Sequence, residues 1–407
     1  MSEWKKVKLG ELYEVHNGLS KGRQFFGTGF PFLTFSNVFN NWFLPDQLES
    51  LVQTTDKERE ACSIKAGDVF ITRTSETMDE LGMSSVALKD YPNATYNGFT
   101  KRLRPKTDRV FPRYMGYYLR TPKFRGQFMA FSSMTTRASL ANNDLLNMEI
   151  ELPPMDIQKN IATILSRYDS LIENYQKQIK LLEEAAQRLY KEWFIDLRFP
   201  GHENTKIVDG VPEGWEIKSI TNNHLFDVAK CRIALFNGNK TYYATADVEG
   251  TYFCNSGVKI EYDNKPSRAQ IQPSLYSVWF ARMSNSFKIV GFVEQNNNRR
   301  EDSILSSGFA GFESHYERFG FLYCLISSQW FNDQKDRYAT GATQVSITNE
   351  GLSRIRCLLP TTRLAEEFSL VTNKIIEETI LYRENCTMLT EARDRLLPKL
   401  MSGEIEI

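Results

Sequence analysis

The sequence predicts a mixed α and β protein, in which two repeated α/β domains are separated by two long helices that form an antiparallel coiled coil. Three observations lead to this prediction. The chain repeats itself at a constant displacement, each copy ends in a long helical pattern, and short strand patterns fill the segments before the helices.

The repeat is clearest in the middle and at the end of the chain. There "MTTRASLANNDLLNMEIELPP" aligns without a gap to "GATQVSITNEGLSRIRCLLPT". The matched pairs include Thr136 and Thr343, Asn142 and Asn349, Tyr175 and Tyr382, and Arg188 and Arg395. A weaker match joins "WKKVKLGELYEV" to "WEIKSITNNHLFDV", near the start of each half. Two copies of one structural unit are therefore expected.

A heptad pattern runs through the first long helix. Its apolar positions are Ile161, Leu165, Tyr168, Ile172, Tyr175, Ile179, Leu182, Ala186, Leu189 and Trp193. The second helix keeps one half of this seam, whereas Thr372, Thr379, Cys386 and Arg393 occupy the alternate positions. A helix with one apolar seam must bury it, and the nearest matching seam belongs to the other helix. An ordinary surface helix packed on its own domain is the alternative.

The repeat and the linker composition predict the domain boundaries. Residues 198–214 are rich in Gly, Pro and polar side chains, which is typical of a linker. The predicted segments are a first domain at 1–152, a central helix at 153–197, the linker, a second domain at 215–359, and a C-terminal helix with its tail at 360–407.

Short strands and one short helix are expected inside each domain. "GDVFITRT" and "PSLYSVWFARM" are β-branched and aromatic runs opened by turn residues, as buried strands are. "PRYMGYYLRTPKFRGQF" and "ERFGFLYCLISSQWFNDQ" lie at matching places and resemble one short helix in each domain.

Composition favours a cytoplasmic globular protein. The chain has 407 residues, of which 41% are hydrophobic and 25% charged, with no formal net charge. It contains no apolar run long enough to cross a membrane, and its start lacks a signal-peptide pattern. The six cysteines form no CxxC pair, which predicts free thiols and no zinc site.

Local charge points to nucleic acid in the first domain. Ten basic residues and one acidic residue lie between Thr95 and Arg137, with aromatic residues interleaved. Such density is typical of phosphate contact, although a solvated basic face is the alternative. The matching stretch of the second domain has five acidic residues against three basic ones, so its case for DNA binding is weaker.

Motifs of catalysis are missing. The sequence has no phosphate-binding GxxxxGK[ST] loop, no HExxH, and no Asn-Pro-Pro-aromatic tetrad of an adenine methyltransferase. The Asp263-x-Lys265 spacing occurs in nucleases, but it is common by chance. A nuclease or methyltransferase acting alone is therefore disfavoured.

The organisation resembles the specificity subunits of type I restriction–modification systems. The resemblance covers essentially the whole chain and depends on "LGELYEV", "GDVFITRTSE", "ELPPMDIQKNIATIL", "VPEGWEI" and "RDRLLPKLMSGEI". It implies a non-catalytic subunit whose two domains are target recognition domains, each reading one half of a bipartite site on double-stranded DNA. The paired helices would set the spacing of the half-sites and dock methylation subunits.

The resemblance also implies partners and cofactors. Two methylation subunits would bind S-adenosylmethionine and methylate adenine, and in some complexes two restriction subunits would add ATP/Mg-driven motor activity and cleavage. This chain itself would hold no cofactor and no metal. A coiled-coil scaffold whose domains bind other proteins is the alternative function, but it leaves the basic stretch unexplained.

Candidate contact residues follow from these patterns. In the first domain we predict DNA contacts at Arg73, Thr74, Ser75, Lys101, Arg102 and Arg137. Their counterparts in the second domain are Arg282, Ser284 and Gln344. Further phosphate contacts are predicted at Lys21, Arg23, Lys230 and Arg232, and partner contacts at Gln158 and Lys159.

Overall fold

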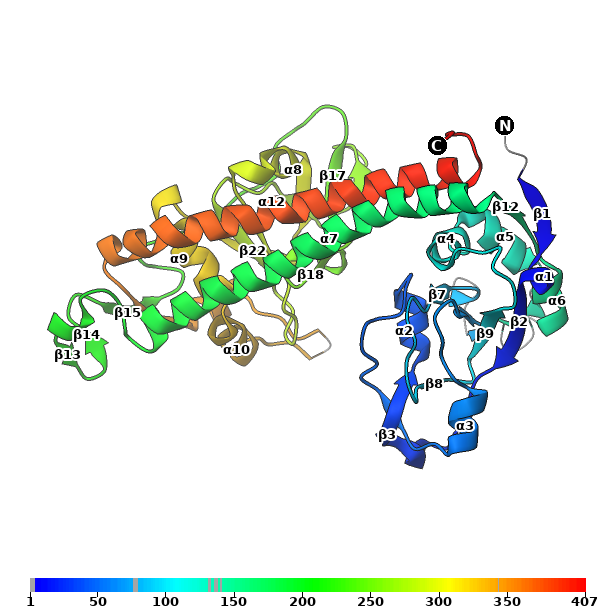
Figure 1. Cartoon of the computed structure of the whole chain (residues 1–407). Helices are drawn as coiled ribbons and strands as arrows, with labels where there is room; N and C mark the ends of the chain where they lie inside the picture. The colour runs from blue at the N-terminus through cyan, green and yellow to red at the C-terminus, as the bar shows by residue number, and fades with distance from the viewer. Residues whose placement is uncertain (1–3, 76–79, 131–132, 135–137, 140, 343) are drawn as a thin grey trace. The chain divides into compact units, whose positions relative to one another are not determined.

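The computed structural model describes residues 4–75, 80–130, 133–134, 138–139, 141–342 and 344–407. It contains two compact units: the first is Met1–Ser170 with Leu389–Ile407, and the second is Leu171–Met388. Each unit includes part of both long helices, α7 (Met155–Tyr190) and α12 (Thr362–Met401). The mixed α and β class predicted from the sequence is confirmed (Figure 1), whereas the consecutive domain boundaries stay a prediction.

An antiparallel sheet in the order β2-β9-β5-β7 forms the centre of the first unit. Its strands are β2 (Tyr13–Asn17), β9 (Thr100–Pro105), β5 (Val69–Thr72) and β7 (Ser84–Val86). A second sheet combines β4 (Leu51–Val52), β3 (Phe26–Leu33) and β8 (Thr95–Tyr96). Strand β1 (Lys5–Lys8) pairs with β12 (Glu149–Leu152), which joins the two ends of this block.

The second unit repeats this arrangement. Its central sheet has the order β16-β25-β22-β23, formed by β16 (Asp227–Val228), β25 (Phe309–Glu313), β22 (Ser277–Ala281) and β23 (Ile289–Phe292). Strand β15 (Glu216–Ser219) pairs with β26 (Arg356–Leu359), as β1 pairs with β12. Another four-stranded sheet consists of β20 (Val258–Ile260), β17 (Lys240–Tyr243), β24 (Ser303–Ser306) and β21 (Ala269–Ile271).

Smaller elements complete both units. In the first unit they are α1 (Leu9–Leu12), α2 (Phe35–Asn40), α3 (Asp56–Ala61), α4 (Pro112–Tyr118), α5 (Pro122–Ala130), α6 (Asn142–Asn147), η1 (Arg23–Phe25), β6 (Thr74–Ser75), β10 (Ser133–Met134) and β11 (Ala138–Ser139). In the second unit they are η3 (Lys191–Ile195), η4 (His202–Asn204), β13 (Ile207–Val208), β14 (Val211–Pro212), η5 (Thr245–Asp247), β18 (Val248–Glu249), β19 (Tyr252–Phe253), η6 (Glu294–Asn296), α8 (Asn297–Asp302), α9 (Tyr316–Ile326), α10 (Gln329–Arg337) and α11 (Asn349–Arg354).

Strands β5 and β22 have the same position in their sheets because their sequences have the same character. Every residue of β5 and of β22 is buried, as their apolar runs predict. Each strand pairs on both sides, β5 with β9 and β7, and β22 with β25 and β23. The two predicted core strands are therefore confirmed.

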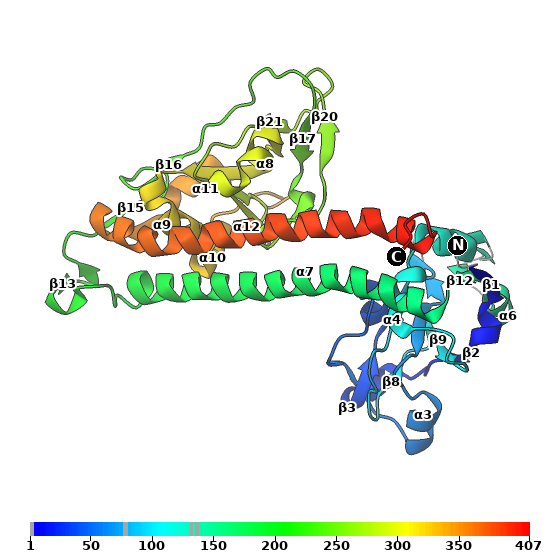
Figure 2. The same ribbon diagram turned by 45° about the horizontal axis from the view of Figure 1, so that its top comes forward.

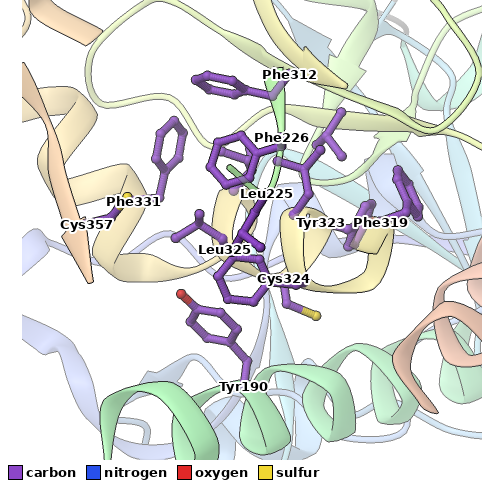
Figure 3. Packing of buried hydrophobic residues seen from close by; sticks show 14 of the residues in the cluster. Tyr190, Leu225, Phe226, Phe312, Phe319, Tyr323, Cys324, Leu325, Phe331 and Cys357 are labelled. Atoms are coloured by element: carbon purple, nitrogen blue, oxygen red, sulfur yellow. The ribbon is translucent and has the colours of Figure 1, made fainter. Parts of the chain in front are cut away.

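The core of the second unit lies between its central sheet and the long helices. Phe226 and Phe312 come from the sheet region, Tyr323 and Leu325 from α9, and Tyr190 from the end of α7, as Figure 3 shows. Burial raises the pKa of the Cys357 thiol in this cluster to about 12, so it stays protonated at neutral pH. This helix end is thus part of the domain core.

The two long helices pack against each other within the first unit. Ile161 and Leu165, near the start of α7, are buried in one cluster with Leu397 and Leu400, near the end of α12. The Arg393 guanidinium donates to Asp169 Oδ1 at 2.7 Å. A helix start beside a helix end means that the two helices run antiparallel.

The same helices also pair within the second unit, where both views show them side by side (Figures 1 and 2). The rings of Tyr175 and Tyr382 have centroids 4.8 Å apart, and those of Phe194 and Phe368 are 4.9 Å apart. The last turn of the central helix is a π-helix, η3, and it places Phe194 in the core. All ten predicted seam positions of the central helix are buried or half-buried, which confirms the antiparallel coiled coil.

The polar positions of the second seam have physical reasons. Helix α9 lies so close to α12 that a Cβ on Gly320 would overlap Thr372 Oγ1. Only small side chains fit on α12 at this crossing, and the Thr372 hydroxyl donates to Phe368 O at 3.0 Å. Thr379 donates likewise to Ile375 O at 2.7 Å. At Thr372 the second seam therefore lies where α9 of the domain packs onto α12.

The expectation of one short helix in each domain was wrong, because each stretch forms two helices. Helix α4 is followed by α5, and α9 is followed by α10. The break falls at a hydroxyl residue in both copies. The side chain of Thr121 accepts from Phe124 N, and that of Ser328 accepts from Phe331 N and caps α10.

Candidate DNA interface

One edge of the central sheet gathers candidate DNA contacts in the first unit. Strand β2 ends at Asn17, which pairs with Lys101, and β5 ends at Thr72, which pairs with Thr100. The residues just beyond these strand ends therefore lie together. They include Arg73 and Phe99, and the Phe99 side chain is 53% exposed.

Arg73 is held at this edge mainly by its backbone. Its N–H donates to Phe99 O at 2.9 Å. Its Nη1 donates to Asn17 Oδ1 over a long 3.4 Å, and its Nη2 makes no hydrogen bond to the described residues, whereas its unpartnered Nε is buried. The next two residues, Thr74 and Ser75, form β6 and pair with Ser139 and Ala138 of β11. Arg73 thus keeps donor capacity for a ligand.

Lys101 lies behind Arg73 and is buried, with 3% exposure. Its Nζ donates to Asn142 Oδ1, at the first position of α6, at 2.6 Å. Burial, with a contribution from the nearby Arg73 charge, lowers the pKa of Lys101 to about 8. An internal cation of this kind positions neighbouring groups and has little surface to offer DNA.

The second unit has an equivalent edge. Arg282 follows β22 as Arg73 follows β5, and its N–H donates to Gly308 O at 2.9 Å. Met283 forms a bridge with Ser346, and Ser284 N donates to Val345 O at 3.0 Å, which matches the pairing of β6 with β11. Gln344 is exposed beside this bridge.

The Arg282 side chain differs from that of Arg73 because each of its nitrogens donates to an acceptor inside the unit. It donates to Phe309 O at 3.2 Å, to Ile347 O at 3.1 Å, and to Asn349 Oδ1 at 2.9 Å. Burial lowers the pKa of this guanidinium from its ordinary value. The predicted counterpart of Arg73 is therefore at the expected place, but each of its three side-chain nitrogens donates within the unit.

Arg102 is a correction to the predicted contacts. Its side chain is 2% exposed, its Nη1 donates to Ser63 O at 2.6 Å, and its guanidinium lies 5.6 Å from the ring centroid of Tyr96. Two other arginines of the basic stretch are also used internally. Arg104 pairs with buried Asp68, and Arg120 donates to the carbonyls of Ser84, Val38, Phe39 and Asn41. Much of this charge therefore ties loops to the core.

The remaining predicted basic contacts lie on the surface or outside the described residues. Arg23, Lys230 and Arg232 are exposed. Lys21 is half-buried, forms an ion pair with Glu58 at 2.8 Å, and lowers the pKa of that carboxyl. Arg137 lies outside the described residues.

Gln158 is a second correction, because the partner contact predicted for it has no free group. The side chain is 1% exposed. Its Oε1 accepts from Phe111 N, and its Nε2 donates to the carbonyls of Arg109 and Pro153, all within 2.9 Å. This amide ties the start of α7 to the first domain. Its neighbour Lys159 is exposed.

Three groups at the sheet edges were not singled out from the sequence. Asn142 and Asn349 were aligned in the repeat, and this match was the available signal for their common task. Asn17 gave no signal, because its relation to Arg73 depends on strand register. Among the described residues no cluster of metal-binding side chains occurs, and no helix there is long and apolar enough to cross a membrane.

Each unit thus has a four-stranded central sheet with an arginine just beyond an inner strand, and the long helices pair within both units. Residues 1–184 match the family model for the type I restriction modification DNA specificity domain. Over its whole length the chain is similar to specificity subunits of type I restriction–modification systems.

Relatives of the chain agree over its whole length. It is 26% identical to the type I restriction enzyme MjaIX specificity subunit of Methanocaldococcus jannaschii, with all of this chain and 94% of the relative covered. It is 21% identical to the HindI specificity subunit of Haemophilus influenzae, with both chains fully covered. The fold matches the crystal structure of the type I S subunit from M. genitalium, with a TM-score of 0.62, 14% identity, and coverage of 98% of this chain and 96% of that one.

Proposed function

We propose that this subunit reads a bipartite DNA target, with one half-site for each α/β domain. The supporting observation is the sheet edge that occurs twice, with Arg73 N bonded to Phe99 O in one unit and Arg282 N bonded to Gly308 O in the other. A second copy of a recognition surface suits a second half-site. Loops at a sheet edge can differ in sequence on a constant scaffold, so the two copies can read different bases.

The helix pair is the proposed spacer between the half-sites. Helix α7 begins directly after the first domain, and its last residue, Tyr190, lies with Phe194 of η3 in the core of the second unit. A continuous helix rises about 1.5 Å per residue, so its length sets a distance. Half-sites about one turn of DNA apart would suit a spacer of this kind.

Methylation subunits are the proposed partners of the helices, and α12 offers them an apolar stripe. Leu370, Leu381 and Met388 are 72%, 39% and 67% exposed. At about 100° per residue, these positions fall on one face of the helix. Lys374 and Glu377 lie between Leu370 and Leu381 near this face, and a surface that combines exposed apolar and charged side chains is typical of one that another protein covers. This stripe replaces Gln158 as the proposed docking site, and Lys159 remains a proposed contact.

We assign no catalysis to this chain in the proposed complex. Adenine methylation, with S-adenosylmethionine, belongs to the methylation subunits. ATP- and Mg-dependent translocation and cleavage belong to restriction subunits, where these join. This chain contributes sequence recognition, because DNA-binding side chains and a spacer require no reaction chemistry.

Co-expression with methylation subunits tests this function. We expect a stable complex that methylates adenine within one bipartite sequence of a plasmid, as mapped by sequencing that detects methylated bases. Replacing residues 215–359 with the equivalent domain of a relative should change one half of the motif and leave the other half intact. A complex that methylates without any bipartite motif, or a chain that forms no complex, would refute the proposal.

A further inference from the structure

Each sheet edge has a hydrogen bond between a basic side chain and the side-chain oxygen of an asparagine, but the basic residue occupies a different position in each unit. In each unit the side-chain oxygen of an asparagine accepts from a basic residue: Asn142 from Lys101 at 2.6 Å, and Asn349 from Arg282 at 2.9 Å. Both asparagines occupy the first position of a short helix, α6 or α11.

The strand register explains why the cations differ. Lys101 lies opposite Ile71 in the first sheet, and the equivalent pair in the second sheet is Ala310 opposite Phe280. The second unit therefore has an alanine where the first unit has its anchoring lysine. Arg282, the counterpart of Arg73, reaches Asn349 in its place.

This exchange leaves the two matched arginines with different donor capacity. Arg282 donates to three internal acceptors through Nε, Nη1 and Nη2. Arg73 makes one long side-chain bond, through Nη1, and its Nη2 makes none to the described residues, whereas its Nε is unpartnered but buried. An arginine gives a bidentate contact to a phosphate or a guanine edge when its donors are free and its guanidinium can turn toward the ligand, whereas three internal bonds hold the Arg282 guanidinium in place and leave one N–H on each Nη.

We propose that Arg73 is a DNA contact of the first unit, whereas its counterpart Arg282 anchors the sheet edge and makes no DNA contact. This inference rests on the proposed function. In the second unit we propose that Lys230 contacts DNA instead. Its side chain is exposed, and the preceding residue, Ala229, lies at the same sheet edge, where its N–H donates to Gly311 O at 3.0 Å. The two half-sites are read by chemically different groups on equivalent scaffolds.

Salt-dependent DNA binding separates the two roles. The experiment uses the complex with methylation subunits and a duplex containing its mapped target. For Arg73→Gln and for Lys230→Gln we expect about tenfold weaker binding, a slope of log affinity against log salt that is smaller by about one, and an unchanged thermal midpoint. Arg73→Lys should restore the slope, because it restores the charge.

Arg282→Gln should give the opposite result: a lower thermal midpoint and a salt slope equal to that of the wild type. If this variant does not assemble, Arg282→Lys makes the same comparison. Lysine keeps the charge but has a single nitrogen, which cannot lie within bonding distance of acceptors spaced for three guanidinium nitrogens, so we expect a lower midpoint with an unchanged slope. A reduced slope in either Arg282 variant, or an unchanged slope in Arg73→Gln, would overturn the inference. A wild-type complex that neither binds nor methylates its target would instead refute the proposed function.

Discussion

Lys101 shows how far a residue's environment can change its chemistry. Burial lowers its pKa to about 8, whereas the unfolded chain keeps the ordinary value near 10.5. Between these values the unfolded state binds more protons, so this group makes the protein more stable as pH rises from about 8 to 10.5. Below about 8 both states are charged and the contribution is constant.

Lys101→Met tests this prediction. The wild type should gain stability relative to the variant between pH 7.5 and pH 10, measured as the difference between their urea midpoints. Loss of the bond to Asn142 Oδ1 lowers the variant's urea midpoint at both pH 7.5 and pH 10, so it does not hide the change of the midpoint difference with pH. Lys106→Met, at an exposed position of the same segment, is the control. A difference that stays constant with pH contradicts the lowered pKa of Lys101.

The basic stretch shows what residue counts cannot predict. Lys and Arg are dense between Thr95 and Arg137, but a residue count does not say which side chains point outward. Along β9 the side chain of Arg102 points to the opposite face from those of Lys101 and Leu103, and on that face the segment at Ser63 and the ring of Tyr96 cover it. Arg73 could be proposed from sequence because it ends a strand, where side chains leave the core.

At the scale of elements, Arg393 explains an irregularity of the second seam. Its guanidinium donates to Asp169 Oδ1 at 2.7 Å and lies 5.0 Å from the ring centroid of Trp42. The Tyr117 hydroxyl also donates to Asp169. The heptad pattern predicted the helix pair, but this polar link could not be predicted, because it depends on a loop and on α4.

Arg393→Ala should destabilise the first unit by about 2 kcal/mol, since it leaves Asp169 without its charged donor. Asp169→Ala should have a similar effect. The double variant should be little less stable than either single variant, because each single variant already removes the bond between Arg393 and Asp169. Thermal midpoints measure these differences. Arg395→Ala is the matched control, because this arginine of α12 is 82% exposed. Additive losses in the double variant would contradict the link.

The apolar stripe on α12 makes a separate prediction about assembly. Leu370→Ser with Met388→Ser should weaken the complex with methylation subunits by about tenfold or more, because both side chains would be buried by the partner. The stability of the chain alone should stay the same, since both positions are exposed. Val371→Ser, also 50% exposed but about 100° around the helix, is the control. Equal effects of stripe and control would exclude this face as the docking site.

At the scale of the whole molecule, the repeat allowed most of the architecture to be predicted. The constant displacement predicted two domains and two long helices, and the apolar strand runs predicted one buried strand in each central sheet. The compact units are nevertheless not consecutive in the sequence, because residues 389–407 belong to the same unit as the first domain. Their sequence alone does not reveal this, since an apolar seam has the same pattern whichever domain it contacts.

The proposed spacer predicts that helix length controls the gap between half-sites. Inserting one heptad with apolar seam positions into α7 after Ser170, and another into α12 after Met388, keeps both seams in phase. The helix pair lengthens by about 10 Å, so the gap should increase by about three base pairs while the bases of each half-site stay the same. Mapping methylated adenine gives both quantities. Seven residues inserted at Gly201, outside the helices, are the control and should leave the gap unchanged. If the longer helix pair gives the original gap, the spacing is set elsewhere in the complex.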